Sequence, residues 1–335
     1  MNTLNFEKSL HALIFKWFKY VMIFLMAEDI FSTPRRVRTA VTLFLASAFV
    51  IGVDGLSQRL LGIEVFLGRP MGLIQHSFPG APTHTYHGIT ASFKHYNDFG
   101  TYLICPLLLL TAFLVSGRPQ KHFLAGILSV GVLVLGLCLW LTFSRGAWFA
   151  FAAGLFLMLF LSGKKPVVWI LSGFFLIPAA AWPAFRERLL FFFISPYGAS
   201  ERAAVWGIAW RMIHEAPFLG KGLGTFMDIC SLYSSGAIVK YAHNCYLQMW
   251  AETGLFSVIS FAGFSGSILY QGVVLYKKTS NVLFLGLICA LFAFLVHCFL
   301  DTGLYSVQLS VLFWLLSGLL AALISTRAAL ARNPE

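Results

Sequence analysis

The sequence predicts an all-α membrane protein, a polytopic bundle of transmembrane helices with a large loop on its outer face. Hydrophobic residues make up 59% of the 335 residues and charged residues only 11%, and the mean hydropathy is +0.80. Several apolar runs reach the roughly 20 residues that a helix needs to cross the hydrocarbon of a bilayer. The alternation typical of a transmembrane β-barrel is absent. Helices are therefore the expected spanning elements.

The apolar runs and their flanks set the expected limits of these helices. Eight spans are predicted, near residues 37–53, 99–116, 123–141, 147–162, 166–184, 255–276, 281–300 and 302–325. A further apolar segment, 10–27, carries Lys16 and Lys19. This segment is either a ninth span, which requires an external N-terminus, or a helix in the cytoplasmic headgroup layer, which requires an internal one.

Basic residues predict the orientation, because Lys and Arg accumulate in the short cytoplasmic loops of membrane proteins. If the spans alternate, basic stretches fall on one face at residues 34–38, 117–122, 163–165, 276–278 and 327–332. Two long loops, 54–98 and 185–243, then lie on the outer face. The net charge of +11 is mainly an orientation signal, so the basic composition does not imply a nucleic-acid partner.

This topology divides the chain into three parts. N-terminal transmembrane helices occupy residues 1–184, the large outer loop residues 185–243, and C-terminal transmembrane helices residues 244–335. The polar and titratable residues that could carry chemistry gather in the large loop and at the span ends next to it.

Residues 200–215 of the large loop predict an amphipathic helix, with Ser200 as its N-cap and Glu201 in its first turn. A helical period of 3.6 residues places four side chains on one face, Arg202, Trp206, Trp210 and Ile213. A guanidinium on an apolar face needs an anionic partner, which favours a functional role for Arg202. The alternative is an arginine that snorkels beside interfacial tryptophans.

Two further features of the loop are expected to be structural. Arg211 lies on the opposite face of the helix and is predicted to pair with Glu215 at i+4. The glycine-spaced segment 216–226 follows no buried strand and lacks a Walker Lys-Ser pair, so it predicts a scaffolding turn rather than a nucleotide site. Contacts from its backbone amides to a phosphate are the minor alternative.

His243 and Asn244 precede a helical sequence at the end of the large loop. The positive end of a helix dipole disfavours the imidazolium form, and neutral imidazole is what a general base must be. The sequence therefore predicts that His243 is a general base, with an interfacial anchor or cap as the alternative. Glu252, farther along, is either an arginine partner or a catalytic acid.

Arg145 lies in the sequence Ser144–Trp148, where one span leaves the outer face and the next begins. It departs from the charge bias of the loops and lies near a helix N-terminus, where a cation is electrostatically disfavoured. An anion should therefore be bound there. A carboxylate would suffice, but a phosphate matches the planar fork of arginine in two parallel hydrogen bonds.

The remaining candidates are weaker. His95, Tyr96 and Asn97 end the first outer loop and are placed to approach the same site. His84 and His87 have metal-like spacing but no matching carboxylate, which favours polar loop residues.

Two residue pairs are open to a structural role. His297 and Asp301, one turn apart at the end of a late span, are expected to form a buried hydrogen-bonded pair. Cys230 and Cys245 both lie at the outer face, where the sequence leaves a disulfide open without a supporting spacing pattern.

The order of these motifs resembles the O-antigen ligase and O-antigen polymerase superfamily of bacterial glycan transferases, which use polyprenyl-linked donors. The matching residues are the Ser144–Trp148 turn, the segment from Arg202 to Phe226, and His243-Asn244 followed by Gly254. The resemblance covers about residues 50–325. This sequence has fewer spans than the family fold, which predicts a truncated or divergent member, and Ser257 departs from the residues usual at its position.

The resemblance implies metal-independent and cofactor-free transfer of a glycan from undecaprenyl diphosphate to an acceptor hydroxyl, at the periplasmic face of the inner membrane. On this basis Arg145 and Arg202 correspond to the arginines that hold the diphosphate, and His243 to the base. The candidate substrate-binding residues are Asn244, Trp206, Asn97, Arg211 and Glu252. Guanidinium groups would stabilise the leaving phosphate and a base would activate the acceptor. The sequence shows no nucleophile elbow and no pair of catalytic carboxylates, so a covalent glycosyl-enzyme intermediate is not expected.

Ligation of O-antigen to lipid A-core is the leading hypothesis, ahead of chain polymerisation and protein O-glycosylation. The acceptor alone separates the three functions, and no residue in the sequence identifies it. A lipid-glycan transporter or assembly scaffold without catalysis is the hypothesis from another class. A transporter should carry ionisable residues through the midplane of its spans. Here the charges gather at the outer face, which favours the enzyme.

Overall fold

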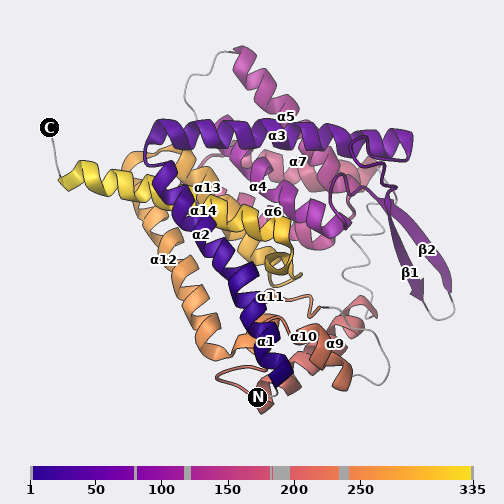
Figure 1. The fold of residues 1–335 in the computed structure, drawn as a ribbon. Coiled ribbons are helices and arrows are strands. Elements are labelled where there is room, and N and C mark those ends of the chain that lie inside the picture. Colours follow the sequence, from indigo (N-terminus) through magenta and orange to yellow (C-terminus); the bar gives the residue numbers. More distant parts are fainter. Residues whose placement is uncertain are drawn as a thin grey trace. The chain divides into compact units, whose positions relative to one another are not determined.

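The computed structural model describes residues 3–78, 81–116, 122–181, 183, 197–233 and 241–332 and is predominantly helical (Figure 1). Seven helices in these ranges are long and apolar enough to cross a membrane: Phe6–Ile30, Pro34–Leu61, Tyr96–Val115, His122–Leu141, Arg145–Ser162, Leu255–Thr279 and Val307–Arg327. This confirms the predicted class, an all-α polytopic bundle.

Two further apolar helices are shorter. Helices α7 (Pro166–Ala181) and α13 (Val282–His297) each contain 16 residues. The predicted span 281–300 is therefore too long, because its helix ends at His297. Residues 182 and 184 of the predicted span 166–184 lie outside the described residues.

The chain forms two compact units. Unit 1 comprises Met1–Ile30, Ser195–Gln271 and Cys298–Ala321, and unit 2 comprises Phe31–Ile194, Gly272–His297 and Ala322–Glu335. Each unit is therefore assembled from segments that are far apart in the sequence.

Helix α4 (Tyr96–Val115) lies at the centre of unit 2, with 83% of its most apolar window buried. It packs against α5 (His122–Leu141), α6 (Arg145–Ser162) and α13. Glycines permit the close approach, since a Cβ at Gly154 would lie 2.5 Å from the Leu108 side chain, and one at Gly286 would lie 2.8 Å from the Leu109 side chain. Its burial on all sides explains why α4 shows no polar face.

Helix α3 (Pro34–Leu61) is longer than the predicted span 37–53, so residues 54–61 are helical and not part of an outer loop. The helix begins after the N-cap Thr33 and ends at Gly62, whose φ of 83° is the left-handed conformation favoured at helix ends. Near this end the fully buried Gln58 accepts hydrogen bonds from the amides of Thr90 and Ala91. The loop that follows α3 is thus tied back to the helix.

A β-hairpin, which the sequence did not predict, follows α3. Strands β1 (Gly72–Phe78) and β2 (Ala81–Gly88) pair antiparallel, with His76 opposite His84. The hairpin extends away from the helices of unit 2 (Figure 1). Its sequence contains no regular alternation of apolar and polar residues, which is the signal by which a strand is recognised.

Unit 1 contains the described part of the large loop. Its helices are α9 (Tyr197–Glu215), α10 (Phe226–Ile229), α11 (Cys245–Thr253), the first part of α12 (Leu255–Thr279) and most of α14 (Val307–Arg332). A small apolar core holds α9, α10 and α11 together, and it includes Ala209, Met212, Phe226 and Ala251. The predicted span 302–325 begins too early, because α14 starts only at Val307.

The N-terminal helix of unit 1 runs through α1 (Thr3–Ala12), a π-helical turn η1 (Leu13–Phe18) and α2 (Lys19–Ile30). It lies along α14, because the rings of Phe24 and Trp314 are 6.2 Å apart and a Cβ at Gly318 would lie 2.6 Å from the Cβ of Ala27. Packing along a membrane-spanning helix favours the first of the two alternatives for residues 10–27, a further span.

Candidate functional site

Helix α9 confirms the amphipathic helix predicted at 200–215, but it begins earlier, at Tyr197. Ser200 is therefore not the N-cap, and Glu201 does not lie in the first turn.

The buried face of α9 is rotated from the predicted one. Ile208, Ala209, Met212 and Ile213 are buried, whereas Trp210 is 45% exposed. Arg202 and Trp206 are half-buried and lie at the edge of the packed face. In the described part of the chain no ion pair involves Arg202, since the pairs found there are Lys8–Asp228, Lys221–Glu215 and His243–Asp301.

The predicted pair between Arg211 and Glu215 is wrong. Arg211 donates from Nη2 to the carbonyl oxygen of Tyr233 at 3.1 Å, and Glu215 pairs with Lys221 and accepts from the Tyr233 hydroxyl at 2.6 Å. The hydrogen bond from Lys221 holds the pKa of Glu215 below its usual value. An exposed ion pair at i+4 contributes little to stability. Arg211 and Glu215 instead contact Tyr233 and Lys221, which the fold brings close to them.

The glycine-spaced segment 216–226 forms a scaffolding turn around the end of α11. Gly222 and Gly224 have positive φ angles of 125° and 74°. The carboxylate of Glu252 accepts hydrogen bonds from the amides of Gly224 at 3.0 Å and Phe226 at 3.2 Å. Glu252 is 1% exposed, and burial raises the pKa of its carboxyl group.

Gly254 closes this turn, and its replacement by alanine is expected to destabilise the loop. Its φ is 79°, and a Cβ would lie 2.0 Å from the carbonyl oxygen of Phe218. Its ψ of 177° places it in a region that essentially only glycine adopts, where another residue costs about 1–3 kcal/mol of strain, and the clash adds to this cost. We expect Gly254→Ala to lower the unfolding temperature of the detergent-solubilised protein, measured by tryptophan fluorescence.

Gly207→Ala is the matched control. Gly207 lies inside α9, and a Cβ there would meet no atom within 4 Å. Alanine at such a position is expected to be neutral or to stabilise the helix by up to about 1 kcal/mol. Equal unfolding temperatures for the two variants would contradict the close contact at Gly254.

His243 directly precedes helix α11. Asn244 is the N-cap of this helix, because its Oδ1 accepts hydrogen bonds from the amides of Tyr246 at 3.0 Å and Leu247 at 3.1 Å. His243 has a φ of 50°, an uncommon value for a residue other than glycine. The cap and this backbone conformation together direct the chain into the helix.

The imidazole of His243 contacts a carboxylate. Its Nδ1 lies 3.1 Å from Oδ1 of Asp301, which also accepts a hydrogen bond from the amide of Thr302 at 2.8 Å. A carboxylate only accepts hydrogen bonds, so in the neutral ring Nδ1 carries the proton and Nε2 presents its lone pair. The side chains of His243 and Asp301 are 45% and 16% exposed. The arrangement can thus accept a proton at Nε2 while the carboxylate orients the ring.

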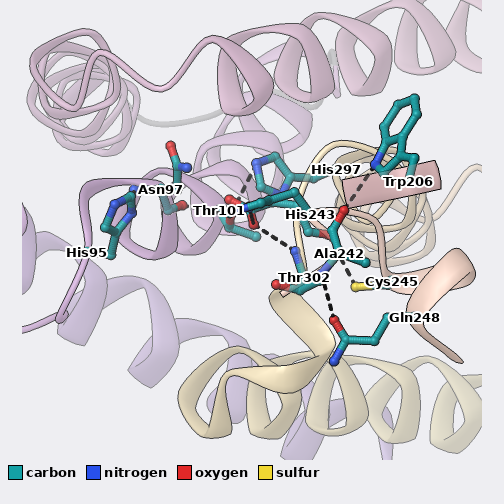
Figure 2. Close-up of polar contacts among 11 residues, drawn as sticks. His95, Asn97, Thr101, Trp206, Ala242, His243, Cys245, Gln248, His297 and Thr302 are labelled. Carbon is teal, nitrogen blue, oxygen red and sulfur yellow. Dashed lines mark hydrogen bonds and ion pairs between the residues drawn. The ribbon is translucent and has the colours of Figure 1, made fainter. Parts of the chain in front are cut away.

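The backbone just before His243 is held by two side chains. Trp206 of α9 donates from Nε1 to the carbonyl oxygen of Ala242 at 3.0 Å, and Gln248 of α11 accepts from the Ala242 amide at 3.1 Å. Figure 2 shows both side chains reaching Ala242 beside the imidazole. Arg202 lies one helical turn before Trp206, about 6 Å along the axis. Unit 1 thus brings His243, Asn244 and Trp206 into one neighbourhood, and Arg202 stands one turn before Trp206 on the same helix.

Several weaker candidates have partners that the sequence did not suggest. His297 lies 3.1 Å from the hydroxyl of Thr101 within unit 2, whereas Asp301 of unit 1 contacts His243. His95 caps α4, because its Nδ1 accepts from the amide of Asn97 at 3.1 Å.

Within the described residues, neither a disulfide nor a metal-ligating cluster is found. Cys230 and Cys245 are free thiols, so no disulfide joins them. No group of three or more metal-ligating side chains occurs among the described residues.

Arg145 lies in unit 2, at the start of α6. The turn that presents it is anchored by Trp148, which donates from Nε1 to the carbonyl oxygen of Leu139 at 2.8 Å. A Cβ at Gly100 of α4 would lie 3.0 Å from the Cβ of Ala147, so the starts of α4 and α6 lie against each other. Unit 2 therefore places Asn97 and Arg145 at the same end of its bundle.

These features define a multi-pass membrane protein with a histidine–carboxylate pair that joins the end of its large loop to the segment between α13 and α14. Residues 130–262 match the family model described as O-antigen ligase, which confirms the resemblance of this chain to the O-antigen ligase superfamily. No curated protein matches the chain. The match supports a function of the ligase or polymerase type, with a lipid-linked glycan donor and an acceptor in the membrane.

Proposed function

We propose that this protein is an inner-membrane glycosyltransferase that moves a glycan from undecaprenyl diphosphate to an acceptor hydroxyl at the periplasmic face. The observation that carries the proposal is the contact of 3.1 Å between His243, at the end of the large loop, and Asp301, which lies between α13 and α14. The family match over residues 130–262, which includes His243, Arg202 and Arg145, supports the same reaction class.

His243 acts as the general base in this reaction. The acceptor hydroxyl attacks the anomeric carbon of the donor glycan, and its proton passes to Nε2 of the imidazole. The bond from the anomeric carbon to the diphosphate oxygen breaks, and undecaprenyl diphosphate leaves with the bonding electrons. Asp301 keeps the proton of the neutral ring on Nδ1 and stabilises the imidazolium that forms.

Arg202 and Arg145 bind the diphosphate and stabilise the negative charge that develops on it. Arg202 suits this role because it is half-buried and engaged in no ion pair within the described residues. Arg145 contributes the second guanidinium from the start of α6. Two planar forks bind a diphosphate more tightly than two ammonium groups would, because each fork forms parallel hydrogen bonds.

The other candidate residues have supporting roles in the proposed site. Asn244 and Trp206 shape the backbone around the base through the contacts described above. Asn97 binds substrate at the end of unit 2 that presents Arg145. Arg211 binds substrate from the exposed side of α9. No metal or cofactor is required for these steps, because the arginines supply the positive charge.

The acceptor distinguishes the functions that this site could perform. Ligation to lipid A-core is the leading proposal, and polymerisation of O-antigen or another polysaccharide, or transfer to a protein hydroxyl, uses the same donor chemistry. A transporter or scaffold without catalysis is less well supported, because a transporter should carry ionisable residues through the midplane of its spans, whereas here the charges gather at the outer face.

Deletion of the gene, followed by gel analysis of lipopolysaccharide, tests the proposal. If the protein is the ligase, we expect all ladder bands on the core to disappear and to return when the intact gene is supplied on a plasmid. A single capped repeat would indicate a polymerase. An unchanged ladder with normal chain lengths would contradict both functions.

A further inference from the structure

Two large apolar side chains in the turn after α9 point away from the packed core. Phe218 is 57% exposed and Leu219 is 73% exposed. The residues on either side of them are packed, because Pro217 is half-buried and Gly220 is buried. Exposed apolar patches mark places where a protein contacts a partner or a membrane. The proposed reaction makes no use of these two side chains.

Hydrogen bonds fix the backbone of this turn to the start of helix α12. The carbonyl oxygen of Pro217 accepts from the amide of Leu255 at 2.9 Å and from Nε1 of Trp250 at 2.9 Å. Farther along the turn, the amide of Lys221 donates to the carbonyl oxygen of Ala251 at 2.9 Å. The segment between these bonds, which carries the two apolar side chains, is therefore held beside the first turn of α12.

The exposed side chains continue an apolar row on α12 itself. Phe256 and Ile259 are both exposed and stand three residues apart, so they lie on one side of the helix. The ring of Phe218 lies 6.0 Å from the ring of Phe256. The turn and the helix thus present one continuous apolar surface.

The length of α12 places this surface at a membrane boundary. The helix is apolar enough to cross a membrane, and its 25 residues extend over about 37 Å. The hydrocarbon core is about 30 Å thick, so the first turn of α12 lies close to the level where acyl chains meet headgroups. Lys277 and Lys278 occupy the other end of the helix, which the distribution of basic residues assigns to the cytoplasmic side. The turn therefore lies beside the outer leaflet.

The side chains around the turn are typical of a membrane interface. Trp210 is exposed, and its ring lies 5.6 Å from the ring of Trp250. Tryptophan is enriched where hydrocarbon meets water. Lys221, two residues after Leu219, pairs with Glu215. An apolar tip with aromatic and charged neighbours has the composition of a segment that lies in the interface of a bilayer.

We infer that Phe218 and Leu219 insert into the outer leaflet and contact the lipid acyl chains just below the headgroups. The turn then anchors the large loop to the bilayer at the level where α12 enters it. The core of α9, α10 and α11 shares this anchor, because α11 ends at Thr253, just before α12 begins. The inference is independent of the proposed function, because contact with lipid requires no transfer of glycan.

A fluorescent label at Leu219→Cys tests this insertion. The six native cysteines are buried, so a thiol-reactive bimane is directed to the introduced side chain. The labelled protein is reconstituted in vesicles of phosphatidylethanolamine and phosphatidylglycerol. We expect strong quenching of the label by lipids that carry a nitroxide near the top of the acyl chain, and weak quenching by aqueous iodide.

Ala204→Cys is the matched control. Ala204 is exposed on the side of α9 that also carries Arg211 and Glu215. The same label at this position should be quenched several-fold more by iodide and several-fold less by the nitroxide lipid. Unfolding temperatures close to that of the wild type verify the fold of each labelled protein, and Phe218→Cys is the second position if Leu219→Cys does not fold.

Two outcomes would overturn the inference. Equal quenching by iodide at both positions would show that the turn faces water. Protection of the turn from both quenchers would show that protein covers it instead of lipid. Loss of that protection on dilution of the protein with excess lipid would identify the covering molecule as a second copy of this chain.

Discussion

Replacing His243 is expected to lower the rate of glycan transfer by about 10²–10⁴-fold, the usual contribution of a positioned general base. The side chain is 45% exposed, so its loss removes little packing. The cap of α11 is provided by Asn244 and remains in place. We expect normal insertion and normal thermal stability, and the measurement is the single-turnover rate of transfer in proteoliposomes.

The choice of substitution matters because the φ of His243 is 50°. Asparagine adopts this left-handed conformation more readily than alanine. His243→Asn therefore removes the base and keeps the backbone conformation, whereas His243→Ala removes the base and also strains that conformation. Both variants should lose transfer, with His243→Asn the more stable of the two. Unchanged turnover in His243→Asn would exclude the imidazole as the base.

The sequence was sufficient to predict most of the helices. Long apolar runs predicted spans whose centres agree with the structure, because burial in hydrocarbon requires length and hydrophobicity that a single sequence displays. The ends were less predictable. Helix α3 continues to Leu61 because polar residues such as Gln58 are buried against the following loop, and a hydropathy pattern cannot show that.

The candidate site was predictable in part. His243 and Asn244 were recognised from a local pattern at a helix start, and the amphipathic helix from its period. Asp301, however, is 58 residues from His243, and its apparent partner in sequence was His297, one turn away. The fold shows that this carboxylate contacts His243. Local spacing predicts partners within a helix but not between segments.

The same reasoning explains the role of Glu252. Gln248 and Glu252 stand at i and i+4 in α11, a spacing that the sequence displays. The other donors to Glu252 are the amides of Gly224 and Phe226, which lie 28 and 26 residues earlier in the chain. Such donors from another segment are identified only when the fold brings the segments together.

Replacing Asp301 with asparagine is expected to lower kcat by about 10³–10⁴-fold, comparable to the loss of an orienting carboxylate in a catalytic triad. The amide has nearly the same shape, and its oxygen can still accept from Thr302, so the fold should be retained. It carries no charge to stabilise the imidazolium, and its NH₂ group can shift the ring proton from Nδ1 to Nε2. The measurement is kcat under saturating donor and acceptor.

A double-mutant comparison decides whether His243 and Asp301 act as one unit. If Asp301 works only through the imidazole, Asp301→Asn should cause no further loss of rate in a protein that already carries His243→Asn. Residues of a catalytic unit show this non-additive behaviour, whereas residues with separate roles have losses that multiply. Multiplied losses would therefore show that Asp301 contributes by another route, and would remove the contact of 3.1 Å as the basis of the mechanism.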